Sequence, residues 1–254
     1  MLRPYFKNTT TQQLSKRLTR FLLVAITAFA VYPKAAYAAP LEDERELISL
    51  NATNSSFDVA LFYEKTGNPK GGVILTYSHA NTPFYLNNIA YVLARHGWST
   101  VLVGASKNKV LPSEETDDDK EDPPTYSAKL SETIRFMREE KGQNNLVILA
   151  QGSIWGKVKD YISDAENDED IFQGLVLLDI KQPGNLKNLP INLPLLDLTT
   201  ARLPSSDFHQ RKIEANRYKF SSYTQVNLPS RLSLTSLKED HLAKRIRGWL
   251  KLNI

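Results

Sequence analysis

The turn at residues 150–156 is placed where a hydrolase would carry its nucleophile. Residues 150–156 (AQGSIWG) follow an apolar run and precede a helical pattern. In a nucleophile elbow a serine stands between strand and helix within G-x-S-x-G, because its strained backbone requires small neighbours. If Ser153 were the nucleophile, its flanking positions would be held by the bulky Gln151 and Trp155. The usual register of the strand instead places Gly152 at the nucleophile position.

These two registers predict different chemistry. Glycine has no side-chain oxygen, so Gly152 at the bend predicts a site without a serine nucleophile, and the bulky neighbours of Ser153 favour this interpretation. Ser153 is then expected to cap the following helix. In the alternative, Ser153 attacks a carboxylic ester or acyl group, and the N–H of Ile154 contributes to the oxyanion hole.

The acid and the base of such a triad follow the nucleophile along the chain. Asp207 lies in a loop after the apolar run 195–199 and is the candidate acid, whereas Asp197 lies inside that run. His241 lies at the start of the last helical pattern and is the candidate base, with an ordinary first-turn residue as the alternative. His209 lies two residues beyond Asp207 and has no separate argument for catalysis.

A second part of the oxyanion hole is expected in the loop at 78–83, after the apolar run 73–77. In serine hydrolases with an elbow, the corresponding loop supplies a backbone N–H, often from a His-Gly pair. Here His79 is followed by Ala80. The loop is therefore either a source of the oxyanion N–H or a structural loop that contains a histidine.

The sequence gives little support for a metal ion or a cofactor. The chain has four histidines, none paired at ligand spacing, and no cysteine. The acidic runs 114–122 and 164–170 lack the glycine and closing glutamate of an EF-hand loop, so they predict solvated loops. The glycine-rich motifs that bind phosphates are missing from the sequence as well. We therefore expect neither a metal nor a cofactor.

The elements that would position these residues alternate between strands and helices. Short apolar or alternating runs predict strands at 57–63, 73–77, 99–103, 146–150, 172–180 and 195–199. Longer amphipathic stretches predict helices at 87–96, 126–142, 154–162, 211–220 and 241–252. This alternation indicates an α/β fold with a mostly parallel sheet, helices on both faces and functional residues at the carboxyl ends of the strands.

The first 38 residues have the three parts of a secretory signal. No acidic residue occurs before residue 33, the apolar run 21–32 follows several basic residues, and Ala36 and Ala38 fit cleavage after Ala38. An uncleaved anchor is the alternative, but twelve helical residues reach only about 18 Å across a hydrocarbon core of about 30 Å. We therefore expect export to a bacterial periplasm as a soluble protein, with a lead-in at 39–56 and one domain at 57–254.

Removal of this signal would reverse the net charge. The chain has 32 basic and 28 acidic residues, a net charge of +4. Residues 1–38 contain 6 basic and no acidic residues, so the remainder has 32 minus 6, or 26, basic residues against 28 acidic ones. A net charge of −2 gives no support to nucleic-acid binding. Without cysteine, stability has to come from a packed core.

Several stretches carry a family resemblance. They are 193–198 (LPLLDL), 211–218 (RKIEANRY), 223–229 (YTQVNLP) and the ending RGWL at 247–250, together with Gly152 in an Ala-x-Gly turn. In these features the chain resembles a proteobacterial family of exported α/β-hydrolase-like proteins of unknown function. The resemblance implies an α/β-hydrolase fold and no particular substrate.

The sequence thus predicts an exported α/β-hydrolase-like protein with a degenerate nucleophile elbow. A non-catalytic binding or envelope role is expected, with a small molecule, an acyl ligand or an envelope component as the partner. The alternative is a serine esterase or acyl hydrolase that uses Ser153, Asp207 and His241, with Ile154 and His79 at the oxyanion hole.

Overall fold

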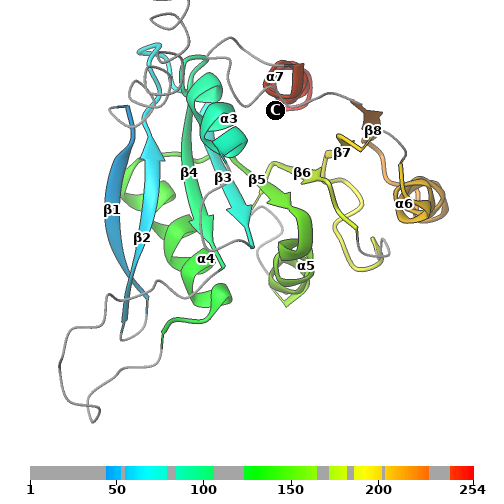
Figure 1. The fold of residues 1–254 in the computed structure, drawn as a ribbon, viewed down its shortest axis with the longest axis horizontal. Coiled ribbons are helices and arrows are strands. Elements are labelled where there is room, and N and C mark those ends of the chain that lie inside the picture. Colours follow the sequence, from blue (N-terminus) through cyan, green and yellow to red (C-terminus); the bar gives the residue numbers. More distant parts are fainter. Residues whose placement is uncertain are drawn as a thin grey trace, which may run out of the picture. The chain divides into compact units, whose positions relative to one another are not determined.

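The six predicted strands and two further strands pair into one eight-stranded sheet in the computed structural model (Figure 1). The structure describes residues 44–52, 55–78, 84–105, 123–164, 172–181, 186–201, 204–228 and 241–254. The strands are β1 (Glu46–Ala52), β2 (Ser55–Phe62), β3 (Gly71–Tyr77), β4 (Trp98–Gly104), β5 (Leu146–Gln151), β6 (Gly174–Leu178), β7 (Leu195–Thr199) and β8 (Tyr223–Asn227). All described residues belong to one compact unit, residues 43–254.

The order of the strands in the sheet is β1-β2-β4-β3-β5-β6-β7-β8. β2 is antiparallel to β1 and β4, whereas all other neighbours are parallel. After β3 the chain first adds β4 on one side and later adds β5 on the other side. This reversal makes the junction of β3 and β5 a topological switch point, where ligands bind at the carboxyl ends of the strands in open α/β sheets.

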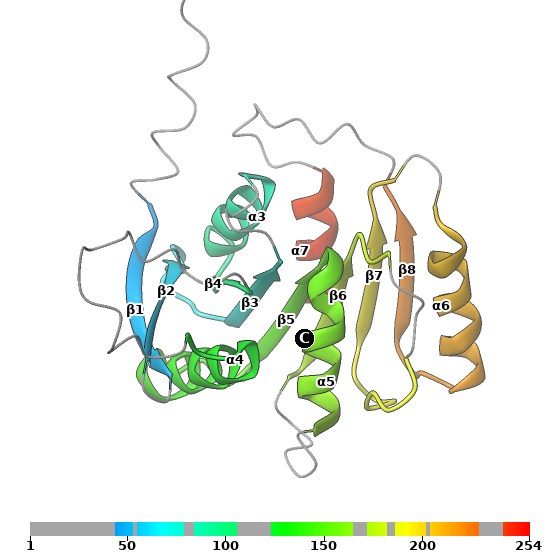
Figure 2. The ribbon, with the colours of Figure 1, turned by 60° about the horizontal axis from the view of Figure 1, so that its bottom comes forward.

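Helices cover both faces of the sheet, as the sequence predicts (Figure 2). The described helices are α3 (Phe84–Ala94), α4 (Tyr126–Arg135), α5 (Trp155–Asp164), α6 (Ser206–Arg217) and α7 (His241–Asn253). Apolar residues of α3 and α7 pack on one face, and apolar residues of α4, α5 and α6 pack on the other. The mostly parallel sheet with two helical layers confirms the predicted fold class.

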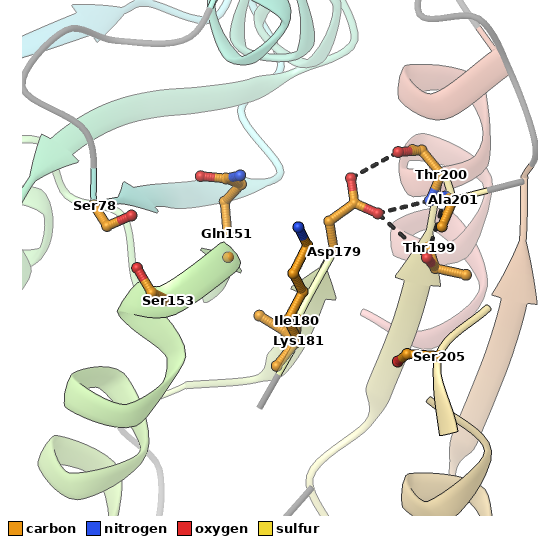
Figure 3. Close-up of a pocket in the computed structure, with 11 residues that line it drawn as sticks. Ser78, Gln151, Ser153, Asp179, Ile180, Lys181, Thr199, Thr200, Ala201 and Ser205 are labelled. Atoms are coloured by element: carbon orange, nitrogen blue, oxygen red, sulfur yellow. Dashed lines mark hydrogen bonds between the residues drawn. The ribbon is translucent and has the colours of Figure 1, made fainter. Parts of the chain in front are cut away.

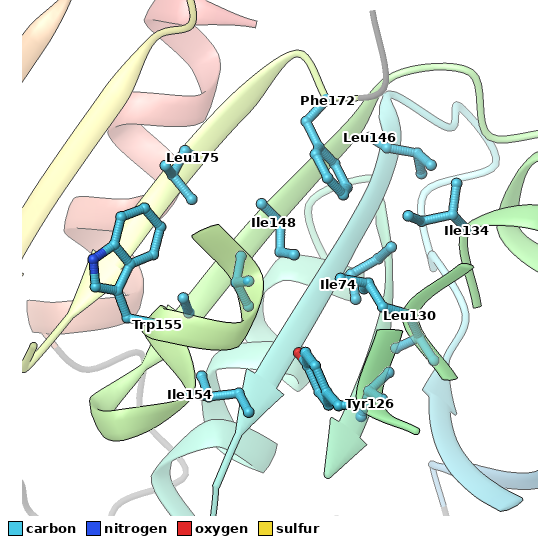
Figure 4. Packing of buried hydrophobic residues seen from close by; sticks show 14 of the residues in the cluster. Ile74, Tyr126, Leu130, Ile134, Leu146, Ile148, Ile154, Trp155, Phe172 and Leu175 are labelled. Atoms are coloured by element: carbon cyan, nitrogen blue, oxygen red, sulfur yellow. The ribbon is translucent and has the colours of Figure 1, made fainter. Parts of the chain in front are cut away.

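The central strands lie in the middle of the sheet because most of their side chains are apolar on both faces. Every residue of β3, β5, β6 and β7 is buried. Because neighbouring side chains of a strand alternate between faces, Ile148 packs in the cluster shown in Figure 4, and Val147 packs in the opposite cluster. Continuous apolar runs are typical of strands buried in this way.

The sequence missed both edge strands. β1 lies within the lead-in predicted at 39–56, so the sheet begins at Glu46, ahead of the domain start placed at residue 57. β8 has the polar sequence YTQVN and is only partly buried. Edge strands carry polar residues and bury little surface, so their alternation gives a weak signal.

Two helix boundaries also differ from the prediction. α6 begins at Ser206 rather than residue 211, because the Oγ of Ser205 accepts a hydrogen bond from the N–H of Phe208 and caps the helix. The helix predicted at 126–142 is divided, and a π-helical turn (Phe136–Glu140) continues α4.

Some predictions fall outside the described residues. These are the signal at 1–38, the loop residue His79, the acidic run 114–122 and residues 165–170 of the second acidic run. None of the helices that the structure describes combines the length and the apolar character needed to span a membrane.

Candidate functional site

A cleft of about 690 Å³ lies at the carboxyl ends of four neighbouring parallel strands. It is lined by Ser78 after β3, residues 151–153 at the end of β5, residues 179–181 after β6, residues 199–201 at the end of β7, and Ser205 (Figure 3). The cleft includes the junction of β3 and β5, so it occupies the place where open α/β sheets bind ligands.

The bend between β5 and α5 lies at Gly152. β5 ends at Gln151, a 3-10 turn covers Gly152–Ile154, and α5 follows from Trp155. Gly152 has a φ of +66°, and a Cβ added there would meet no heavy atom within 4 Å. This left-handed backbone costs an ordinary L-residue about 1–2 kcal/mol. Gly152, rather than Ser153, therefore has the left-handed backbone conformation at the strand-to-helix bend.

Ser153 lines the cleft and is exposed. Its hydroxyl makes no hydrogen bond with any described residue, so the expected capping of the following helix is not formed. In Figure 3 the hydroxyl lies on the side of Ser78 and away from Asp179. Ile154, the candidate for the oxyanion N–H, follows in the same turn with its side chain buried.

The structure does not gather the three triad candidates around the cleft. Of these candidates only Ser153 lines it. Asp207 lies in the first turn of α6 rather than in a loop, because Ser205 starts that helix. His241 is the exposed first residue of α7. No hydrogen bond links Asp207 or His241 to Ser153.

Among the described residues, the acidic residue that lines the cleft is Asp179, which was not predicted as a site residue from the sequence. It directly follows β6 and has a φ of +51°, a conformation that aspartate tolerates better than most residues. Its carboxylate accepts hydrogen bonds from Thr200 N and Thr200 Oγ1, both at 2.7 Å, and from Thr199 Oγ1 at 3.3 Å. The sequence does contain a signal for Asp179, because this residue directly follows a buried apolar run. Functional residues of such sheets lie at the carboxyl ends of strands, and the same rule drew attention to residue 152.

The negative charge of Asp179 affects the pKa of Tyr85, which lies near the start of α3. Burial, and secondarily the negative charge of Asp179, raise the pKa of Tyr85 to about 12. Tyr85 therefore stays a neutral phenol at physiological pH. On the described lining of the cleft, Lys181 is the basic counterpart of Asp179, and its exposed side chain extends into the cleft in Figure 3.

A buried ion pair supports the wall of the cleft beside Asp179. Asp197 in β7 and Arg211 in α6 are fully buried, and Arg211 Nε lies 2.8 Å from Asp197 Oδ2. Tyr223 Oη donates to the same oxygen at 2.7 Å. Arg211 Nη1 donates to the carbonyl oxygen of Ile180 at 3.3 Å, so the pair holds the backbone next to Asp179. Asp197 thus has a structural role away from the cleft, which agrees with its predicted place inside a strand.

Gln151 differs from these satisfied groups. It lines the cleft with an exposed fraction of 8%, and its buried Oε1 has no hydrogen-bond partner. From the sequence alone, Gln151 stands out only as a bulky neighbour of Ser153. A buried polar group without a partner costs free energy, so such groups in native proteins call for an explanation.

Within the described part of the chain, no three His, Cys, Asp or Glu side chains are grouped so that they could hold a metal ion.

Solved structures identify the class of the fold. The chain is similar to a lipase/esterase from Lactobacillus plantarum, with 11% identity, a TM-score of 0.58 and coverage of 82% of this chain and 97% of that one. It is also similar to an α/β serine hydrolase without a lid from Xanthomonas campestris, with 11% identity, a TM-score of 0.56 and coverage of 82% and 94%. A membrane phospholipase A matches with 12% identity, a TM-score of 0.52 and coverage of 93% and 98%. These matches and the strand order define an α/β-hydrolase fold.

Within that class, residues 103–252 match the family described as "Protein of unknown function (DUF3530)". The match covers more than half of the chain, and the protein belongs to this family. This confirms the resemblance to a hydrolase-like family of unknown function. No curated protein matches the sequence.

Proposed function

We propose that this protein is a non-catalytic binding protein that uses the cleft of an α/β-hydrolase fold as a ligand site. The observation that carries the proposal is the position of Gly152. It lies at the strand-to-helix bend with a φ of +66°, where an active hydrolase would carry a serine or another nucleophile. A glycine has no side-chain atom that can attack a carbonyl carbon, so the cleft binds without forming a covalent intermediate.

The surroundings of Ser153 support the same proposal. A serine hydroxyl needs an adjacent base to become a nucleophile at neutral pH, and the base needs an orienting acid. Ser153 has neither as a hydrogen-bond partner among the described residues, and Asp207 and His241 lie outside the cleft lining. Asp179 lines the cleft, but its carboxylate turns toward Thr199 and Thr200.

The second candidate function is a serine esterase or acyl hydrolase. It is favoured by one observation, the exposure of the Ser153 hydroxyl within the cleft and beside the first turn of α5. In that mechanism Ser153 would attack, His241 would accept its proton, Asp207 would orient His241, and the N–H of Ile154 would hold the oxyanion.

The experiment that separates the two functions is labelling with a fluorophosphonate, which reacts with activated serines. The purified chain and its Ser153→Ala variant are incubated with the probe and separated on a gel. We expect no labelling above a heat-denatured control in either sample. Labelling of the wild-type chain that disappears in Ser153→Ala would establish the hydrolase instead.

Export to the periplasm is a separate part of the proposal, supported by the basic and apolar pattern of residues 1–38. Expression of the full chain in a Gram-negative host, followed by fractionation and mass spectrometry, tests it. A periplasmic product that begins at Ala39 is expected. A product that keeps residues 1–38 and sediments with membranes would show an anchor.

A further inference from the structure

The two helical layers of the molecule differ in their charge. On the layer formed by α3 and α7, neither helix contains an acidic residue, whereas α7 carries Lys244, Arg245, Arg247 and Lys251. On the opposite layer, formed by α4, α5 and α6, acidic and basic residues are mixed, and Arg135 at the end of α4 forms ion pairs with three glutamates. The α3–α7 layer is therefore the positively charged side of the sheet.

The basic side chains of α7 lie on its outward face. Because an α-helix has 3.6 residues per turn, Lys244, Gly248 and Lys251 lie above one another along one side of the helix. Lys244, Arg245 and Lys251 are exposed, whereas Ile246 between them is buried against the sheet. None of these three basic residues forms an ion pair with a described residue. Their charge is therefore available to an external partner.

The end of α3 extends the same surface. α3 and α7 are in contact and lie side by side in Figure 2. Nη1 of Arg247 donates a hydrogen bond to Nε2 of His96, just after the end of α3, at 2.5 Å. The neighbouring Arg95 is exposed, and its guanidinium lies over the ring of Tyr91, 5.5 Å from the ring centroid. The outer face of this layer thus continues from α7 to a further cation beside an aromatic ring.

A short loop adds positive charge beside the end of α3. The N–H of Lys65 donates to the carbonyl oxygen of Ala94 at 2.9 Å, and the N–H of Lys70 donates to that of Gly97 at 2.8 Å. Both lysines are exposed. The acidic residue of this loop, Glu64, accepts three hydrogen bonds from within the loop itself. With two lysines and one glutamate, the loop has a net positive charge.

Apolar groups are exposed among these charges. Leu252 follows Lys251 in the last turn of α7 and is 84% exposed, and Tyr91 is half-buried. Basic side chains are attracted to anionic headgroups, whereas leucine and tyrosine are suited to the boundary between headgroups and acyl chains. A nucleic acid or another soluble polyanion would use the charges but would leave the leucine in water. The combination therefore favours a lipid surface.

We propose that the α3–α7 layer docks on an anionic lipid surface, with Lys244, Arg245 and Lys251 at the headgroups and Leu252 at the boundary with the acyl chains. This interaction goes beyond the proposed function, and it does not depend on whether the cleft binds or hydrolyses its ligand. Each basic residue close to an anionic membrane strengthens binding by about fivefold, so the three exposed charges of α7 together contribute more than about tenfold.

The first test uses the lack of cysteine in the chain. Leu252→Cys and Ile213→Cys are each labelled with the environment-sensitive fluorophore NBD in the full chain. Vesicles of equal amounts of phosphatidylglycerol and phosphatidylcholine are then added. Ile213 is the matched control, because it is an exposed apolar residue of α6 on the opposite layer. We expect a blue-shifted and stronger emission at position 252 and little change at position 213. Equal changes at the two positions, or no change at position 252, would overturn the proposal.

Two sets of charge variants locate the contact in the chain labelled at position 252. Both sets neutralise three exposed basic residues, so the change in net charge is the same, and circular dichroism checks that each variant is folded. The first set lies on α7 and consists of Lys244→Gln, Arg245→Gln and Lys251→Gln. The second lies on α6 and the turn after it and consists of Lys212→Gln, Arg217→Gln and Lys219→Gln. We expect the first set to raise the lipid concentration at half-maximal shift at least tenfold and the second to change it less than about threefold. Equal effects of the two sets would overturn the proposal.

Three conditions test the chemistry of the partner. Vesicles of phosphatidylcholine alone should give no shift at position 252. In about 1 M salt the Debye length falls to about 3 Å, so most of the shift on anionic vesicles should be lost. A shift that is as strong on neutral vesicles or in high salt would overturn the electrostatic contact. Polyphosphate is the third condition, and binding of polyphosphate without a shift on anionic vesicles would assign the layer to a soluble polyanion and overturn the lipid proposal.

Discussion

The two ends of the cleft differ in how well their polar groups are satisfied. At the ends of β6 and β7, the Asp179 carboxylate accepts three hydrogen bonds from Thr199 and Thr200. At the end of β5, Gln151 is buried with an unpartnered oxygen beside the open backbone of Gly152. The first end has the properties of a structural cluster, and the second has those of a site that is completed by something else.

This difference continues below the surface of the cleft. The Asp179 end rests on the ion pair of Asp197 and Arg211, which also holds the carbonyl of Ile180. Substitutions at the two ends of the cleft are therefore expected to affect stability and ligand binding separately. Changes at the Asp179 end should alter the free energy of unfolding, and changes at the Gly152 end should alter ligand binding.

The largest effect is expected when the buried ion pair is broken. Asp197→Ala leaves the Arg211 guanidinium buried without its carboxylate, so the free energy of unfolding should fall by about 3–5 kcal/mol. Urea unfolding followed by circular dichroism measures this change. Asp207→Ala, in the first turn of α6, is the matched control and should cost about 1 kcal/mol or less. Equal losses in the two variants would contradict the structural role of the pair.

A smaller loss is expected at Asp179 itself. Asp179→Ala removes three hydrogen bonds to a charged group and places alanine at a φ of +51°, so unfolding should become easier by about 2–3 kcal/mol. Asp179→Asn keeps an acceptor for Thr200 N and tolerates this backbone conformation, and it should cost about 1 kcal/mol. The same urea titration distinguishes them. If the alanine variant were as stable as the wild type, Asp179 would not be a structural residue.

At the other end, Gly152→Ala should cost only the strain of its backbone. A φ of +66° costs alanine about 1–2 kcal/mol, and the new Cβ meets no neighbour. Gly142 has a φ of +64° and similarly open surroundings, so Gly142→Ala is the control with the same expected cost. A loss at Gly152 that exceeds the loss at Gly142 by more than about 1 kcal/mol would show that the space above Gly152 is occupied.

The smallest change is expected at Gln151, with the opposite sign. Gln151→Leu replaces an unpartnered buried amide with an apolar side chain of similar size, so the free energy of unfolding should stay equal or rise by up to about 1 kcal/mol. A destabilisation above about 1 kcal/mol would place Gln151 among the structural residues and remove the contrast between the two ends.

The core of this fold could be predicted from the sequence because its signals are local. The apolar runs of β3, β5 and β7 identify buried strands, and the residues after β5 place Gly152 at the bend. The edge strands β1 and β8 were missed because half-buried polar strands lack a continuous apolar run. Asp207 was predicted to lie in a loop, but it lies in the first turn of α6 because Ser205 caps the helix and the helix begins at Ser206.

Which cleft side chains find hydrogen-bond partners could not be predicted from the sequence, because the partners come from neighbouring strands. Asp179 is satisfied by Thr199 and Thr200, which follow a different strand of the sheet. The unpartnered state of Gln151 likewise depends on what the ends of β3 and β6 place around it. A sequence pattern identifies a strand end, but the partners of its side chains come from the pairing of the sheet.

The most direct test of the central claim is the intact mass of the full chain after incubation with excess fluorophosphonate, measured beside Ser153→Ala. With Gly152 at the bend and no activated serine, the wild-type mass should stay unchanged, as in the variant. A wild-type mass increased by one phosphonyl group, with no increase in Ser153→Ala, would show a working serine nucleophile and contradict the account.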